Sequence, residues 1–342
     1  MSNATPEKTR VAVLYTSVFE SLTEVREDIR EDMDLEINAR TISETLVAEG
    51  FEALPQAFGK DTTELVAGLS RNKPDIVFNL SECPFLSPEK EMHACALLEL
   101  LRLPYTGNGP LALGICNNKS LTKRILMGED IPTPPFILYT ADPTENPDIP
   151  YPLVVKPAND DGSAGITENS FVNNLEELQR QVKYLKTGFK QNALAEKFVG
   201  GREFNVGLLG NGTAADPHRV LPPSELVYTT NRWRLCTYHS KWDKEHPSFH
   251  EIAPVCPAPA PQELIDRMFH ITLECARIFR LTGYARVDFR TDEQGELYVL
   301  EVNPNPDISP DAGMSRAARA AGISYPGLVR EILRLGLVLG AR

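Results

Sequence analysis

The sequence lacks the patterns that identify several common classes of protein. Its six cysteines are widely spaced with no C-x-x-C pair, which argues against a zinc site or a disulfide framework and predicts reduced, buried thiols. Lysines and arginines are scattered and the net charge is −12, which argues against a nucleic-acid surface. No apolar run approaches membrane-spanning length, and the polar N-terminus lacks the apolar core of a secretion signal. These absences predict a cytoplasmic protein that binds neither nucleic acid nor a membrane.

The length and the order of the elements predict an α/β protein with more than one domain. A chain of 342 residues is long enough for two or three domains. Apolar runs at 11–15 and 75–80 fit buried strands, and the spacing at 38–49 and 92–101 fits helices. This alternation predicts a small α/β domain that reaches about Gly114.

One hairpin near the C-terminus carries the densest group of polar side chains. Two β-rich runs flank a short glycine-containing turn, which predicts antiparallel pairing. With the turn centred on 294–295, Arg286 lies opposite Asn303, and Asp288 lies opposite Glu301. These four side chains then share one face. The other face would carry the apolar side chains Val287, Phe289, Leu300 and Val302.

This polar patch has two interpretations. For an isolated hairpin, a solvated face with an ordinary cross-strand ion pair is the common one. The run at 303–307 contains prolines that cannot continue the strand, so the carboxylates lie where the chain turns away. Asp, Glu and Asn oxygens suit Mg²⁺, which takes one or two carboxylates plus substrate phosphates. The hairpin therefore predicts a metal site made by Asp288, Glu301 and Asn303, with a nucleotide nearby.

Two other stretches have the composition of a nucleotide site. A strand at 153–157 bears Lys156 and leads into a loop with Gly162 and Ser163, where backbone N–H groups can wrap phosphates. The alternative is a simple hairpin loop, because one short glycine pattern is not specific. Glu196 and Glu203 flank a tight turn, and an adenine amine and a ribose diol both need such acceptors.

The loops after the first strands should line a crevice, because ligands of α/β sheets bind outside the carboxyl ends of the strands. Glu20 and Glu91 are the polar candidates there. The alternative, which residue statistics favour, is that each is an exposed surface carboxylate.

Taken together, these pieces resemble the ATP-grasp fold and, within it, the D-alanine–D-alanine ligase family. The resemblance covers nearly the whole chain, and the ordered set of motifs is far more specific than any one of them. The motifs are LPYTG at 103–107, NKSLTK at 118–123 before IPTP at 131–134, KP at 156–157 with its glycine loop, EKF at 196–198 with GRE at 201–203, and RVD at 286–288 with EVN at 301–303.

The resemblance implies a mixed α/β and α+β architecture. An N-terminal Rossmann-like, pre-ATP-grasp α/β domain would precede two ATP-grasp subdomains, one central and one C-terminal with the metal hairpin. The corresponding boundaries are 1–115, 116–200 and 201–342.

The resemblance also implies cofactors and a role for each matching position. The cofactors would be ATP and two Mg²⁺ ions, with Mn²⁺ as an alternative. The nucleotide would be bound by Lys119, Lys156, Gly162, Ser163, Glu196, Lys197, Phe198 and Glu203, and the metal ions by Asp288, Glu301 and Asn303. Arg286 would stabilise the tetrahedral intermediate, Lys241 would reach the transferred phosphoryl group, and Glu20 would take the place of an acid that binds the first substrate.

The chain departs from the family pattern mainly where the family binds amino acids. Glu20 aligns only approximately, because the family's Gly-Gly-x-Ser-x-Glu loop is absent and the chain has YTSVFE at 15–20. The tyrosine after the loop lysine is Trp242, and the serine that would bind the second substrate's carboxylate aligns with Ala312. The ATP half therefore matches well and the amino-acid half poorly.

Enzymes of this family phosphorylate a carboxylate, and an amine then attacks the acyl phosphate to give an amide, ADP and phosphate. The leading hypothesis is accordingly an ATP-dependent carboxylate–amine ligase acting on small acids and amines, such as amino acids or peptides; a homodimer is compatible with it. The alternatives are an ATP-grasp kinase that phosphorylates a hydroxylated substrate, and a degenerate nucleotide-binding module.

Because water destroys an acyl phosphate, such an enzyme needs a lid. The stretches 160–165 and 238–254 have the composition for lids, and the second contains Lys241 and Trp242. The alternative is a plain surface loop whose Trp242 packs on a neighbouring domain.

Overall fold

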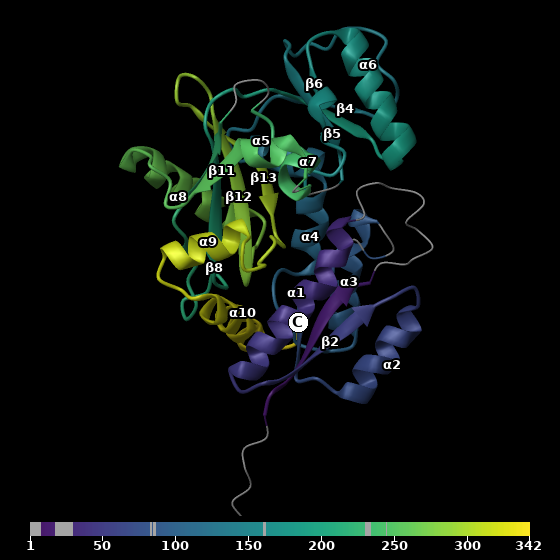
Figure 1. The fold of residues 1–342 in the computed structure, drawn as a ribbon, viewed down its shortest axis with the longest axis vertical. Helices are drawn as coiled ribbons and strands as arrows, with labels where there is room; N and C mark the ends of the chain where they lie inside the picture. Colours follow the sequence, from purple (N-terminus) through teal and green to yellow (C-terminus); the bar gives the residue numbers. More distant parts are fainter. Residues whose placement is uncertain are drawn as a thin grey trace, which may run out of the picture.

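Three β-sheets, formed by successive stretches of the chain, organise the fold (Figure 1). The computed structural model describes residues 8–17, 30–82, 84, 87–159, 162–229, 234–243 and 245–342. Within these ranges, no helix is long and apolar enough to cross a membrane.

The first sheet is parallel and has the strand order β2-β1-β3. Its strands are β1 (Arg10–Thr16), β2 (Glu52–Phe58) and β3 (Ile76–Leu80), and its helices are α1 (Arg30–Ala48), α2 (Thr62–Asn72) and α3 (Glu91–Leu100). The sequence pattern indicated β1 and β3, whose residues are all buried except Arg10. It gave no sign of β2, an edge strand with Pro55 and several exposed side chains.

The second sheet is antiparallel and has the order β4-β7-β5-β6. Its strands are β4 (Phe136–Tyr139), β5 (Leu153–Pro157), β6 (Phe171–Val172) and β7 (Ala193–Lys197). Helix α6 (Leu175–Tyr184) packs its apolar side on this sheet, and the two form a separate core at one end of the molecule (Figure 1). Two short helical turns, η4 (Glu168–Ser170) and η5 (Leu185–Phe189), flank β6 and α6.

The third sheet has the order β11-β10-β8-β12-β13, with β9 paired to β8. Its strands are β8 (Glu203–Leu209), β9 (Arg219–Val220), β10 (Ser224–Tyr228), β11 (Ile252–Val255), β12 (Tyr284–Thr291) and β13 (Leu297–Asn303). Helix α8 (Gln262–Ile278) contributes to the core on one side of this sheet.

The prediction of the hairpin's apolar face is wrong at Leu300. A β-bulge lies in β13, so that Phe289 pairs with Val299 while Asp288 still pairs with Glu301. Leu300 is the extra residue and is only partly buried, and Val299 takes its place in the core.

The remaining helices join the sheets. Their bounds are η3 (Pro88–Lys90), α4 (Pro110–Asn117), α5 (Lys119–Gly128), α7 (Tyr238–Trp242), η6 (Pro247–Glu251), α9 (Gly313–Ala320) and α10 (Tyr325–Leu339). Asn118 caps α5 by accepting the N–H of Leu121, which fixes the start of the helix that bears Lys119. Helices α9 and α10 pack into the same apolar core as α1, β1 and β3, so the two ends of the chain share one core.

The predicted burial of the cysteines is correct in part. Of the five cysteines in the described part of the chain, Cys95, Cys116 and Cys275 are buried, whereas Cys236 and Cys256 are partly exposed.

Candidate active site

The β12–β13 hairpin brings its four polar side chains together as the sequence predicted. Arg286 pairs with Asn303, and Asp288 pairs with Glu301. The Arg286 guanidinium binds Asp288 with both ends of its fork, from Nε to Oδ1 at 2.7 Å and from Nη2 to Oδ2 at 2.8 Å. Its Nη2 is also 3.9 Å from Oε1 of Glu301. The patch is thus a charged cluster that is mostly shielded from water, and the interpretation as an ordinary solvated sheet face is wrong.

The surroundings of the two carboxylates of this patch shift their pKa values in opposite directions. Burial raises the pKa of Asp288 to about 6, although Arg286 opposes the shift. Burial would also raise the pKa of Glu301, but Lys119, Lys156 and Arg286, with a hydrogen bond from Asp288, lower it to about 2. Two carboxylates crowded beside three cations could hold a ligand that carries both metal ions and phosphates.

Asn205 is a member of this site that sequence reasoning missed. It lies on β8 directly across from Asp288, and its Nδ2 donates to Asp288 Oδ1 at 2.7 Å. The signal was present, because Asn205 lies two residues after Glu203 on the same strand and therefore on the same face.

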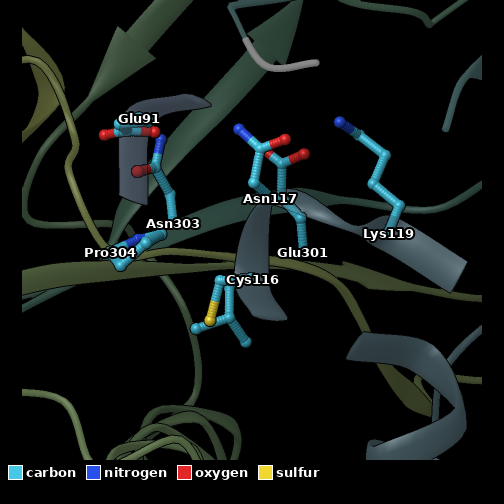
Figure 2. A pocket seen from close by; sticks show the side chains of 8 residues that line it. Glu91, Cys116, Asn117, Lys119, Glu301, Asn303 and Pro304 are labelled. Atoms are coloured by element: carbon cyan, nitrogen blue, oxygen red, sulfur yellow. The ribbon is translucent and has the colours of Figure 1, made fainter. Parts of the chain in front are cut away.

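A pocket opens beside Glu301 and Asn303 of the hairpin. Figure 2 shows the side chains of Glu91, Asn117, Lys119, Glu301 and Asn303 projecting toward the same open side. These side chains come from the starts of α3 and α5, the end of α4 and the end of β13. The pocket therefore lies where three helix ends meet the hairpin.

Glu91 is buried, with 5 % of its surface exposed, so the interpretation as a surface carboxylate is wrong. Its Oε1 accepts a hydrogen bond from Asn305 Nδ2 at 2.8 Å, and Asn305 Oδ1 accepts one from the Tyr284 hydroxyl at 2.7 Å. The backbone N–H of Asn305 donates to Asn303 Oδ1 at 2.9 Å, which fixes the orientation of that carboxamide. Asn305 thus connects Glu91 to the end of the hairpin. Glu20, the other crevice candidate, lies outside the described residues.

The predicted nucleotide residues Lys156 and Glu196 meet on the second sheet. They lie diagonally on the neighbouring strands β5 and β7, and the Lys156 ammonium is 2.6 Å from Glu196 Oε1. A third residue, Lys123 of α5, places its ammonium 2.8 Å from Glu196 Oε2. The Glu196 carboxylate is therefore held between two buried ammonium groups. A buried acceptor of this kind fits a ligand that brings an N–H group.

Glu203 lies at the start of β8 and is held by two partners that the sequence did not single out. Its Oε2 accepts from Arg290 Nε at 2.9 Å and from the Tyr228 hydroxyl at 2.7 Å. Arg290 follows Arg286 and Asp288 at alternate positions of β12, so the same period of two could have found it.

Lys197 and Phe198, which were also predicted to bind the nucleotide, contact the segment that precedes β5. The Lys197 ammonium donates to the carbonyls of Pro150 and Tyr151, at 3.1 and 3.0 Å. The Phe198 N–H donates to the Pro152 carbonyl at 3.1 Å, and its ring lies edge-on to Phe171. The structure therefore does not bring the Lys197 ammonium to the Lys156–Glu196 pair.

The two predicted lid stretches contact each other. Trp242 Nε1 donates to the Gly162 carbonyl at 2.8 Å, and the Tyr238 N–H donates to the Ile166 carbonyl at 3.0 Å. The stretch at 238–254 contains the short helices α7 and η6 and the start of β11. The Lys241 ammonium lies 4.6 Å from the centre of the Trp242 ring.

Comparisons with known proteins identify the family of the chain. The sequence pattern of the family described as "D-ala D-ala ligase C-terminus" matches residues 126–334. The D-alanine–D-alanine ligase of Carboxydothermus hydrogenoformans is 35% identical over 256 residues, which are 70% of this chain and 75% of that protein. The ligase of Bordetella avium is 32% identical over 240 residues, 69% of this chain and 71% of that protein.

Solved structures extend the similarity of fold to almost the whole chain. The D-alanine–D-alanine ligase of Bacillus anthracis, complexed with ATP, has a TM-score of 0.76 at 24% identity and covers 97% of this chain and 98% of its own. The chain therefore belongs to the D-alanine–D-alanine ligase family of ATP-dependent ligases, and it has the ATP-grasp fold.

Proposed function

We propose that this protein joins a small carboxylic acid to an amine at the expense of ATP, through an acyl phosphate. The observation that carries the proposal is the patch of Asp288, Glu301 and Asn303 beside the Arg286 guanidinium. The positive charges of Lys119 and Lys156 also act on this patch, because they lower the pKa of Glu301. A kinase or a degenerate module is not favoured, because the chain belongs to a ligase family and keeps each of these charged positions.

The nucleotide would lie between the second and third sheets. Lys119 and Lys156 would offset the charge of the phosphates, and Gly162 and Ser163 have the left-handed backbone (φ of 61° and 67°) of a tight phosphate loop. The buried Glu196 carboxylate has acceptor capacity beyond its contacts with Lys123 and Lys156, because each oxygen has two lone pairs, and this fits the 6-amino group of adenine. Glu203 would accept from the ribose.

Asp288, Glu301 and Asn303 present the hard oxygen donors that Mg²⁺ or Mn²⁺ requires, so this donor set fits two such ions. When bound, the metal ions would supply positive charge that offsets the charge of the phosphate oxygens. Asn205 and Arg286 would orient Asp288 for this role, because both donate to its oxygens.

The protein's own cations would perform the rest of the chemistry. An amine that attacks the acyl phosphate produces a negatively charged tetrahedral oxygen, and the Arg286 guanidinium would stabilise it. Lys241 would approach the transferred phosphoryl group. The mechanism requires no covalent enzyme nucleophile.

The test supplies ATP, Mg²⁺ and a panel of candidate acids, each with and without amines, and measures phosphate and ADP. A ligase releases phosphate together with an amide product only when an acceptor amine is present. Phosphorylated product without phosphate release would assign the site to a kinase. No nucleotide turnover with any member of the panel would contradict the proposal.

The residues expected to bind the carboxylate of the second substrate predict that D-alanine is a poor substrate. Ala312, which aligns with the family's carboxylate-binding serine, is the N-cap of α9 and provides no hydroxyl. The nearby Ser309 hydroxyl is 2.9 Å from Asp307 Oδ2 and donates to it. We expect weak D-alanyl-D-alanine synthesis and about a tenfold gain in kcat/KM for D-alanine in Ala312→Ser, the effect of one charge-assisted hydrogen bond.

The matched control is Ala320→Ser, at the exposed end of the same helix. Dipeptide formation should be measured at several D-alanine concentrations in all three proteins. Vigorous synthesis by the unchanged protein would show that other groups of this loop bind the carboxylate.

The contact between Trp242 and the glycine loop predicts a fluorescent signal of nucleotide binding. The sequence has two tryptophans, and Trp233 lies outside the described residues, so Trp233→Phe leaves Trp242 as the only indole. Its Nε1–H bonds Gly162, in the loop expected to wrap the phosphates, so loop ordering should change its environment. Titration with Mg²⁺ and a non-hydrolysable ATP analogue should shift its emission, and an unchanged spectrum at demonstrated saturation would exclude Trp242 from closure.

A further inference from the structure

Lys123 is the most deeply buried lysine near the proposed site, and the function above gives it no role. It lies on α5 with 1 % of its side chain exposed, and its ammonium contacts Glu196 Oε2 at 2.8 Å and Thr133 Oγ1 at 2.7 Å. Thr133 in turn donates to the Val299 carbonyl at 2.8 Å. These contacts tie the ammonium to the second sheet and to the hairpin strand β13.

Keeping a charged lysine at this position is unfavourable. Burial lowers the pKa of Lys123 to about 8, in spite of the neighbouring Glu196 carboxylate, and Lys156 adds to the effect. A buried ion pair is often no better for stability than apolar side chains of the same shape. Lys123 therefore calls for an explanation other than stability.

Glu196 supplies that explanation, because its two oxygens contact different lysines. Oε1 accepts a hydrogen bond from Lys156 at 2.6 Å. Oε2 lies 2.8 Å from the Lys123 ammonium. Each oxygen of the carboxylate is therefore next to the charge of a different buried lysine, and Lys123 offsets the charge of Glu196 from the side of α5.

The second lysine matters most when ATP is bound. Lys156 is then expected to engage the phosphates, which weakens its hold on Glu196. Lys123 would remain beside Glu196, because it is not expected to bind the phosphates and its ammonium is held by Thr133. An ionised carboxylate accepts the 6-amino group of adenine, whereas a protonated one can donate to the 6-oxo group of hypoxanthine or guanine.

We propose that Lys123 is a positioning residue that keeps Glu196 ionised and oriented toward the base, so that it sets the preference for adenine over 6-oxopurines. The inference rests on the proposed function, in which Glu196 contacts the base.

The experiment compares ATP with ITP, which differs at the 6-position and lacks the amino group. KM and Kd for both nucleotides should be measured for the unchanged protein and for Lys123→Met. We expect the preference for ATP over ITP to fall about tenfold in Lys123→Met, the effect of weakening one charge-assisted hydrogen bond. The value of kcat with ATP should change far less, because Lys123 touches no reacting group.

Two further variants keep the test decisive. Lys123→Gln retains an N–H donor but no charge, so it should also lose preference and can replace the Met variant if that variant does not fold. Leu126→Ala, a fully buried change on the same helix, loosens α5 without removing a charge and should leave the preference unchanged.

The outcomes separate the inference from the function it depends on. If the unchanged protein binds ATP and ITP equally well, the assignment of Glu196 to the base is wrong. If it prefers ATP and both Lys123 variants keep that preference, the role of Lys123 is overturned. An equal loss in Leu126→Ala would also overturn it, because loosening of the helix would then suffice.

Discussion

Glu301→Gln is expected to lower turnover about a thousandfold while leaving the fold intact. The change removes a negative charge and preserves the shape of the side chain. Glu301 lies opposite Asp288 in the hairpin and close to three cations, which lower its pKa to about 2. A carboxylate whose ionised form is favoured by neighbouring cations is suited to holding metal ions, and glutamine supplies only a neutral oxygen.

The matched control is Glu296→Gln, the same chemical change near the turn of the same hairpin. Glu296 is exposed, and its carboxylate pairs with Arg267 at 3.2 Å. Steady-state turnover over a range of Mg²⁺ concentrations should separate the two variants, with circular dichroism to confirm folding. Equal activity of Glu301→Gln and the unchanged protein at saturating Mg²⁺ would remove Glu301 from the metal site.

Arg286→Lys is expected to lower kcat about a hundredfold with little change in ATP binding. Lysine keeps the charge but cannot reproduce the planar fork that now grips both oxygens of Asp288 at 2.7 and 2.8 Å. A tetrahedral oxygen that forms during amide synthesis would lose its aligned donor. Product formation in a single turnover, with ATP and both substrates prebound, measures this step directly.

Arg286 has two roles that a Mg²⁺ titration can distinguish. If it mainly orients Asp288, excess Mg²⁺ should restore the activity of Arg286→Lys; our assignment to the oxyanion predicts no restoration. The control is Arg277→Lys, an exposed residue of α8 that pairs with Glu129 and Glu274 and should keep full activity.

The hairpin was predictable because its information is local. The period of two decides which side chains of a strand share a face, so the grouping of the four polar side chains follows from the sequence. The pairs Arg286–Asn303 and Asp288–Glu301 also depend on the bulge, because Phe289 and Thr291, nearer the turn, pair one position out of that register. The bulge at Leu300 is not encoded by that period. Only the structure shows the bulge, because there Val299 and not Leu300 enters the core.

The pocket beside the hairpin was less predictable because its information is tertiary. Glu91 is buried by contact with Asn305, which lies 214 positions later in the sequence. Nothing near Glu91 in the sequence announces that neighbour. The Lys123–Glu196 contact has the same character: it joins a helix and a strand that the sequence pattern predicts well separately but does not place together.

The core shared by the two ends of the chain has a consequence for synthesis on the ribosome. Chains generally fold by domains from the N-terminus as they emerge. Here the apolar sides of α1 and β1 are covered partly by α10, whose Leu328, Ile332 and Leu333 are fully buried in that core. The sheet of β1–β3 therefore waits for α10, which is synthesised after both other sheets, and a nascent chain stalled after β13 would expose the core around β1 although every predicted metal ligand had already been made.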